Sequence, residues 1–274
     1  MKSLCLFVDS ERTDQYLNSL VYCVLRLDVR RVTFIHIKGL IPEQPRAADT
    51  GLSARAMGGV QAQLQGLAVR GEYLFSTGPH AGTHRSLADV YSAERAREIQ
   101  SLYRRCQEAD LIYSNEAIEY SDLRKCMRRL AALGADAYVD ITAIRKRYVG
   151  DLVATSLVEG IQGLYTFDLT GARPDFEQPW RLLIHDLEDQ KPPAFAYINI
   201  LNTALYRSCV RLVALRAPAL RVTLGVTVTL LLAVALGSWY LGSESPAIRT
   251  MFAISGVASI LSLFFVFVPP RSGR

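Results

Sequence analysis

Residues 4–38 read LCLFVDSERTDQYLNSLVYCVLRLDVRRVTFIHIK, and the patterns in this stretch decide the fold class. An apolar run at 4–8 ends at an Asp-Ser pair, and residues 13–27 repeat apolar side chains at helical spacing. A β-branched run follows at 32–37. A strand, a helix and a second strand in this order predict a βαβ unit with parallel strands.

The same alternation continues along the chain to about residue 190. Apolar periodicity predicts further helices at 52–67, 86–109, 120–133 and 146–158. Short apolar runs predict strands at 72–75, 111–113, 137–141, 163–169 and 180–187. Nearly continuous apolar strands are typical of parallel sheets that are buried on both faces. We therefore predict an α/β Rossmann-like domain with a mostly parallel sheet over residues 1–190.

A connecting helix is predicted within 191–221, and two long apolar runs follow it at 222–241 and 250–268. Neither run contains Asp, Glu, Lys or Arg. Because an apolar helix of roughly 20 residues crosses the hydrocarbon core, we predict a C-terminal two-helix transmembrane hairpin. The alternative is a buried core hairpin. Arginines flank the hairpin and predict a cytoplasmic N-terminus and a cytoplasmic tail at 269–274, namely Arg207, Arg211, Arg216, Arg221, Arg271 and Arg274.

Ser255, Ser259 and Ser262 share one face of the second predicted span. Small hydroxyl residues on one face favour close helix packing, or alternatively a mildly polar face that lines a pore. One hairpin encloses no pore, so both interpretations require self-association. We predict a homo-oligomer, either a dimer or a tetramer.

The motifs of several enzyme classes are missing from the sequence. No GxGxxG follows the first strand, and no Walker loop, GxSxG or HExxH occurs. The five cysteines form no CxxC pair, which is typical of reduced thiols in a cytosolic domain. His80 and His84 lie in a loop-like Gly-rich stretch, so no metal site is predicted. We expect no cofactor and no catalytic residue.

Ligands of parallel sheets bind at the carboxyl ends of the strands. Polar residues follow three of the predicted strands: Asp9, Ser10 and Arg12, then Asn115 and Glu116, then Asp140, Thr142, Arg145 and Lys146. A helix that begins just after Thr142, with two bases in its first turn, predicts an anion site. The alternative is a set of solvated surface charges.

The stretch 138–146, YVDITAIRK, resembles a signature of the CRISPR-associated Rossmann fold (CARF) family. That signature has an apolar strand, an Asp or Asn, a hydroxyl residue, two glycines, a Thr or Ser, and a base. Asp140, Thr142 and the basic pair match it, and Ala143-Ile144 replaces the two glycines. Asp9-Ser10 after the first strand also resembles that family's ligand site.

The resemblance implies a sensor that binds a cyclic oligonucleotide, with cyclic oligoadenylate favoured, in a dimer interface. The phosphates would meet Arg145, Lys146 and the helix end, and the hydroxyls would meet Ser10, Asn115 and Asp140. Together with the hairpin, it implies a two-pass effector in a bacterial inner membrane. Ligand binding would then trigger permeabilisation or depolarisation in antiviral defence, without direct binding of duplex nucleic acid.

Two other functions fit the same residues. One is a membrane-anchored enzyme that cleaves nucleotides or NAD, with Glu116 or Glu119 as the catalytic acid. The other is an adaptor that recruits a partner to the membrane and binds no small ligand. Nucleotide turnover would distinguish the enzyme, and a closed, ligand-free strand edge would favour the adaptor.

Overall fold

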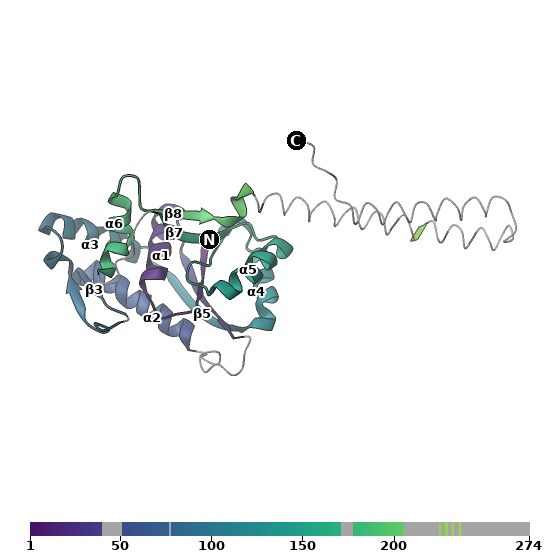
Figure 1. Cartoon of the computed structure of the whole chain (residues 1–274), viewed down its shortest axis with the longest axis horizontal. Helices are drawn as coiled ribbons and strands as arrows, with labels where there is room; N and C mark the ends of the chain where they lie inside the picture. Colours follow the sequence, from purple (N-terminus) through teal and green to yellow (C-terminus); the bar gives the residue numbers. More distant parts are fainter. Residues whose placement is uncertain are drawn as a thin grey trace. The chain divides into compact units, whose positions relative to one another are not determined.

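The computed structural model describes residues 1–39, 51–76, 78–170, 178–204 and 206, together with 225, 228, 229, 232 and 236. The chain divides into two compact units, Met1–Thr203 and Ala204–Arg274. Figure 1 labels the helices and some of the strands of the first unit, which contains the candidate site.

Six strands form the central sheet in the order β5-β2-β1-β6-β7-β8. All neighbouring strands are parallel except β8, which runs antiparallel to β7. Counted along the chain, the strand order is 3-2-1-4-5-6, so the direction of winding reverses between β1 and β6. The strands are β1 Ser3–Val8, β2 Arg31–Lys38, β5 Ile112–Glu119, β6 Ala137–Asp140, β7 Leu164–Leu169 and β8 Phe195–Asn199.

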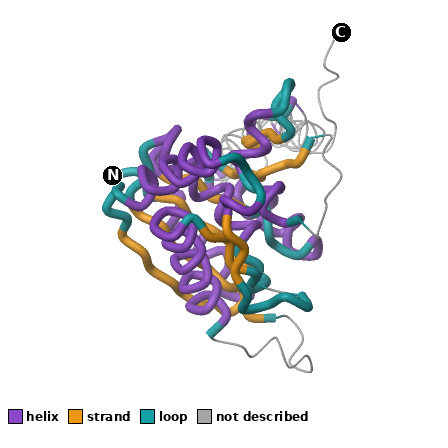
Figure 2. The backbone as a smooth tube through the Cα atoms, turned by 90° about the vertical axis from the view of Figure 1, so that its left-hand side faces the viewer, coloured by secondary structure: helices purple, strands orange, loops and turns teal. Residues whose placement is uncertain are grey.

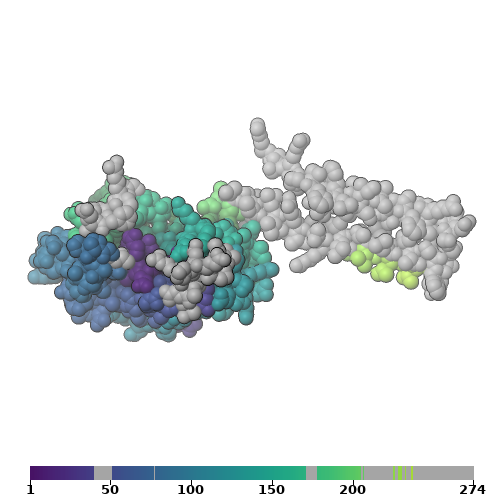
Figure 3. Space-filling view, turned by 60° about the horizontal axis from the view of Figure 1, so that its bottom comes forward, coloured from purple at the N-terminus to yellow at the C-terminus, as the bar shows by residue number. Residues whose placement is uncertain are grey.

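Helices cover both faces of this sheet (Figures 1 and 2). One layer contains α1, which contacts α2, α3 and α6. The other contains α4 and α5, which contact each other. In Figure 3 the blue surface of the β3–α3 region and the teal surface of α4 and α5 gather at opposite ends of the unit. The helices are α1 Asp14–Leu27, α2 Leu52–Gln65, α3 Ala93–Gln107, α4 Leu123–Ala131, α5 Lys146–Glu159 and α6 Ile184–Asp189.

A small antiparallel hairpin is inserted between α2 and α3. The strands β3 (Glu72–Leu74) and β4 (His84–Ser86) pair with each other and not with the central sheet. A π-helical turn at Gly66–Arg70 leads into the hairpin, and a 3-10 turn at Leu87–Asp89 leads out of it. This insertion forms one wall of the cavity described below.

The central strand β1 explains why the sheet forms the core. All six of its residues are buried, because helices cover both of its faces. Leu4, Leu6 and Val8 belong to the apolar cluster that also contains the buried face of α1. Full burial of each such side chain contributes about 1.5–3 kcal/mol. The predicted fold class, a mostly parallel α/β Rossmann-like domain, is confirmed.

The strand predicted at 180–187 is wrong, because the segment forms a 3-10 turn at Pro179–Leu182 followed by α6. The buried Asn18 of α1 decides this conformation. Its Nδ2 donates to the carbonyl of Leu182, and its Oδ1 accepts from the amide of Ile184, both at 2.8 Å. These bonds hold the backbone in a turn that a strand does not allow.

The segment 191–221, in which a connecting helix is predicted, also begins differently, because residues 195–199 form β8. Two aromatic pairs favour the strand. Tyr197 stacks on Tyr165 with ring centroids 5.0 Å apart, and Phe195 stacks on Phe167 at 4.8 Å. Aromatic cross-strand pairs of this kind stabilise a sheet.

Two predicted boundaries change. The strand predicted at 111–113 continues to Glu119, because β5 pairs with β2 along eight residues. The helix predicted from residue 86 begins at Ala93, where the hydroxyl of Ser92 caps it by accepting from the amide of Arg95 at 3.2 Å. The change in β5 moves two of the candidate site residues.

The predicted membrane spans at 222–241 and 250–268 lie outside the described residues, apart from five helical positions between 225 and 236. In the part of the chain that the structure describes, no helix meets the length and hydropathy that a membrane crossing requires. The hairpin, the inner-membrane location and the cytoplasmic ends stay predictions.

Candidate functional site

The candidate site lies where β1 and β6 end side by side, at the point where the winding of the sheet reverses. In open α/β sheets this crevice is where ligands bind. Two loops border it: residues 9–13, which lead from β1 to α1, and residues 141–145, which lead from β6 to α5.

An ion pair joins the two loops. Arg145 Nε donates to Asp9 Oδ2, and the two side chains retain 34% and 11% of their exposure. Burial raises the pKa of the Asp9 carboxyl, and the Arg145 guanidinium opposes that shift. The pair therefore brings together two residues that the sequence placed at neighbouring strand ends.

The buried Tyr16 of α1 closes the loop after β1. Its hydroxyl accepts from the amides of Asp9 at 3.3 Å and Ser10 at 3.2 Å, and donates to the Ser10 carbonyl at 2.9 Å. The Ser10 hydroxyl donates to Gln15. Because these amides already have a partner, this loop does not offer them to a phosphate.

Asp140 and Thr142 lie beneath the site and shape the second loop. Asp140 is 2% exposed, and its Oδ1 accepts from the amide of Thr142 at 2.8 Å. The Thr142 hydroxyl accepts from the amide of Phe167 on β7 at 2.7 Å. Burial raises the pKa of the Asp140 carboxyl, and the hydrogen bond from the Thr142 amide opposes that shift. These two side chains hold the loop, and the buried Asp140 offers no surface to a ligand.

If Asp140 holds the loop, two substitutions at this position should have different effects on the free energy of unfolding. Asp140→Asn keeps the oxygen that accepts from Thr142 and removes a carboxyl that resists ionisation, so we expect it to be at least as stable as wild type at pH 7. Asp140→Ala removes the acceptor and should lower the free energy of unfolding by about 1–2 kcal/mol. Urea unfolding of both variants measures this. Equal destabilisation by Asn and Ala would contradict it.

The N-terminus of α5 carries the exposed positive charge of the site. Arg145 is the N-cap, one position before the first turn in which it was predicted, and Lys146 and Arg147 open the helix. No side chain caps this end and no acid lies in its first turn. Among the described residues, the Lys146 ammonium and the backbone amides of 146 and 147 have no hydrogen-bonding partner.

Arg147 is held beside this end by Tyr148. Its guanidinium lies 4.7 Å from the Tyr148 ring centroid and donates to the Tyr148 hydroxyl at 3.0 Å. Free helix amides, the helix dipole and two adjacent cations attract an anion to one place. Sequence reasoning named Arg145 and Lys146 for this site but did not include Arg147.

Asn115 and Glu116 do not join the site, which corrects their predicted position. Both lie inside β5, level with the middle of β2, and they point to opposite faces of the sheet. Asn115 faces Met57 of α2, and Glu116 accepts from Arg129 of α4. Glu119, the other acid considered for an enzyme, pairs with Lys38 at 2.8 Å.

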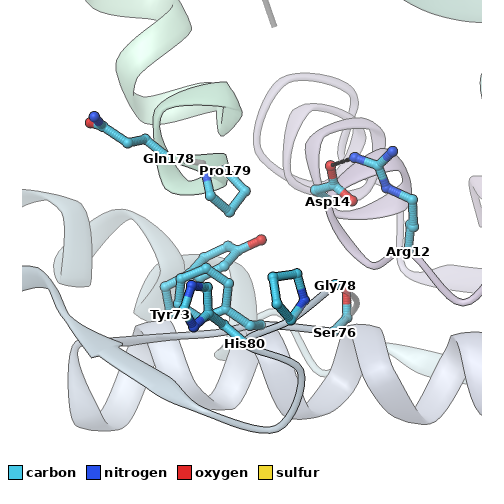
Figure 4. A pocket seen from close by; sticks show the side chains of 10 residues that line it. Arg12, Asp14, Tyr73, Ser76, Gly78, His80, Gln178 and Pro179 are labelled. Atoms are coloured by element: carbon cyan, nitrogen blue, oxygen red, sulfur yellow. Dashed lines mark hydrogen bonds and ion pairs between the residues drawn. The ribbon is translucent and has the colours of Figure 1, made fainter. Parts of the chain in front are cut away.

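Arg12 faces a separate hollow on the α1 side of the same sheet edge. It pairs with Asp14 at 3.0 Å, and both residues line a cavity of about 790 Å³ that the β3–β4 hairpin also borders (Figure 4). Tyr73 and Phe75 were not predicted as functional, because the short apolar pattern at 72–75 indicates a strand and nothing more.

No family model and no curated protein matches the sequence. Among solved structures, the chain is similar to Enterococcus italicus Csm6 bound to cyclic hexa-2'-fluoro-hexa-dAMP, with 10% sequence identity and a TM-score of 0.38. The match covers 97% of this chain and 56% of that chain, so this chain spans little more than half of that protein's length. The strand order and the site themselves define the class: an α/β Rossmann-like domain with a basic helix start at the switch point of its sheet.

Proposed function

We propose that this protein is a membrane effector whose Rossmann-like domain senses a cyclic oligonucleotide. The observation that carries the proposal is the uncapped N-terminus of α5, where Arg145, Lys146 and Arg147 gather at the switch point of the sheet. A phosphate placed there would accept from free amides and from cations, which gives short, charge-assisted hydrogen bonds.

The geometry favours one end of the crevice for the phosphates. Tyr16 occupies the amides after β1, and Asp14 lies in the first turn of α1, so that helix start repels an anion. The start of α5 carries no acid. A phosphate therefore binds on the α5 side, as the CARF resemblance of residues 138–146 also implies.

A cyclic oligonucleotide carries one charge per phosphate and needs several such places around its ring. Two copies of the domain, each offering one α5 start, would supply a symmetric set of cations. This is why we propose a homo-oligomer, with cyclic oligoadenylate as the favoured ligand. The isologous pairing of two subunits is the commonest arrangement of soluble oligomers.

The proposed output depends on the predicted spans at 222–241 and 250–268. Ligand binding would shift the arrangement of the subunits, re-pack the hairpins and permeabilise or depolarise a bacterial inner membrane as an antiviral response. A ligand shifts such an equilibrium only by its difference in affinity for the two arrangements. The ligand must therefore bind the open arrangement more tightly.

Thermal unfolding of the full chain in detergent, with a panel of cyclic di-, tri-, tetra- and hexanucleotides, tests the sensor. A ligand at about a hundred times its Kd adds roughly 2.7 kcal/mol of stability. We expect one member of the panel to raise the melting temperature selectively. No shift with any member, in a folded sample, would overturn the proposal.

Lys146→Ala should weaken binding of that ligand about tenfold or more, because a charge-assisted hydrogen bond contributes roughly 1.5–3 kcal/mol. Isothermal titration calorimetry measures the Kd. Lys125→Ala is the matched control, because Lys125 is an exposed lysine on α4, away from the crevice. Equal affinities of the Lys146 and Lys125 variants would rule out the start of α5 as the phosphate site.

A further inference from the structure

The cavity beside Arg12 is separate from the phosphate site on α5 and has a different chemistry. Its volume of about 790 Å³ lies in the range of small-molecule sites. Three elements border it: the start of α1, the β3–β4 hairpin with its connecting residues, and the turn that begins at Pro179. Figure 4 shows these elements around the open space.

Aromatic and proline rings form the walls on the hairpin side. Phe75 packs edge-on against Tyr73 with ring centroids 5.3 Å apart, and His80 lies 5.6 Å from Phe75. Trp180 supports them from behind, with its ring 6.0 Å from that of Phe75. A flat ligand ring can lie against such walls, because aromatic rings pair by stacking and by edge-to-face contact.

The Tyr73 hydroxyl points into the cavity and has no partner among the described residues. Tyr73 is 3% exposed, yet its hydroxyl forms no hydrogen bond with any residue that the structure describes. Figure 4 shows this hydroxyl directed toward the space that Asp14 and Pro179 also border. Burial raises the pKa of Tyr73, so the group is a neutral donor. This hydroxyl can therefore form a hydrogen bond with a ligand in the cavity without giving up a partner in the protein.

Among the described residues that line the cavity, one arginine and one aspartate oppose each other in charge, unlike the cluster of bases at α5. Asp14 neutralises Arg12, and the pair presents acceptor and donor groups side by side. The cavity therefore favours an uncharged ligand with a polar edge over a phosphate. An aliphatic ligand would leave the Tyr73 hydroxyl and the Asp14 carboxylate unmatched, whereas a nitrogen heterocycle offers ring nitrogens and N–H groups to both.

From these observations we infer that the cavity binds a neutral, planar nitrogen heterocycle of nucleobase size. The ring lies against Phe75 and His80, and its polar edge meets the Tyr73 hydroxyl and the Arg12–Asp14 pair. This inference does not depend on the proposed function, because it requires neither a phosphate nor a second subunit.

Trp180 reports on occupancy of the cavity. The chain has two tryptophans, so Trp239→Phe makes Trp180 the sole emitter when the full chain in detergent is excited at a wavelength that nucleosides do not absorb. Adenosine and guanosine are the uncharged probes, and ribose 5-phosphate is the anionic probe without a base. We expect a saturable change in emission with a nucleoside and none with ribose 5-phosphate.

In the same background, Tyr73→Phe should raise the Kd for the nucleoside about five- to tenfold, and Phe75→Ala should abolish saturable binding. Tyr138→Phe, a tyrosine on β6 outside the cavity, is the matched control and should leave the Kd unchanged. Circular dichroism shows whether each variant is folded. Absence of binding in the folded parent overturns the inference, as does an unchanged Kd in folded Tyr73→Phe.

Failure of this inference and failure of the proposed function are distinguishable. Loss of the nucleoside signal with retained binding of a cyclic oligonucleotide would refute the cavity alone. Nucleoside binding without any cyclic oligonucleotide binding would support the cavity and refute the sensor.

Discussion

Acidification from pH 6.5 to pH 4.5 should lower the free energy of unfolding by about 2–3 kcal/mol through His185 alone. His185 is 4% exposed, and burial, assisted by Arg95, lowers its pKa to about 3. The unfolded chain binds a proton near the ordinary value of 6.5, whereas the folded protein does not. The contribution is therefore present above pH 6.5 and is lost as the pH falls.

The hydrogen bonds of His185 fit a neutral ring. Tyr91 donates to Asp186 at 2.5 Å, which leaves its oxygen to accept from His185 Nε2 at 3.3 Å. His185 Nδ1 is then the acceptor for the Tyr103 hydroxyl at 2.8 Å. A proton on Nδ1 would disrupt this arrangement between α3 and α6.

Urea unfolding at several pH values, followed by near-ultraviolet circular dichroism, measures this slope. His185→Gln should start from a lower stability and lose much less of it on acidification. Burial raises the pKa of Asp186, so this carboxyl makes the folded protein more stable as the pH falls, opposite to the effect of His185. Because Asp186 is present in both proteins, the difference in slope between variant and wild type isolates the contribution of the histidine. His84→Gln, at an exposed histidine, should retain the wild-type slope. Parallel slopes for wild type and His185→Gln would contradict the assignment.

Asn18→Leu should lower the free energy of unfolding by about 2–5 kcal/mol. The substitution leaves the Leu182 carbonyl and the Ile184 amide buried without their partner, and each such group costs about 1–3 kcal/mol. Chemical unfolding at pH 7 measures the loss. Asn115→Leu, at an exposed position of β5, is the matched control and should change stability by less than about 0.5 kcal/mol. A loss below about 1 kcal/mol for Asn18→Leu would show that the bridge contributes little.

The elements that could be predicted from the sequence are those whose own pattern decides their structure. Residues 4–8 are apolar throughout and become a strand buried on both faces. The segment 180–187 is apolar as well, but short apolar runs fit a strand or a helix equally. What decides it is Asn18, a residue more than 160 positions earlier in the chain.

Polar edge strands are difficult to predict for a different reason. Four of the six residues at 114–119 are polar, because β5 is the last strand of the sheet and part of its surface is exposed. The pattern therefore indicated a loop after Tyr113, and Asn115 and Glu116 were assigned to a strand end that lies further on.

The site was predicted only in part. The rule that ligands bind at the carboxyl ends of parallel strands says where the strands end, but not in which direction each side chain points. It correctly placed Asp9 and Arg145 near each other. Tyr16 was missed, since in sequence it is one more apolar position of a helix. Asp140 was taken for a ligand contact, although its carboxyl points into the protein and holds the loop.

The antiparallel strand β8 determines where a truncated fragment of the chain can end. It covers the hydrogen-bonding edge of β7, and its rings cover Tyr165 and Phe167. A fragment that stops before Phe195 would expose a row of unpaired amides and carbonyls beside two uncovered aromatic side chains. Open edges of this kind recruit other chains and lead to aggregation. A soluble form of the domain must therefore retain the residues up to Thr203, even though a shorter fragment would contain the whole crevice.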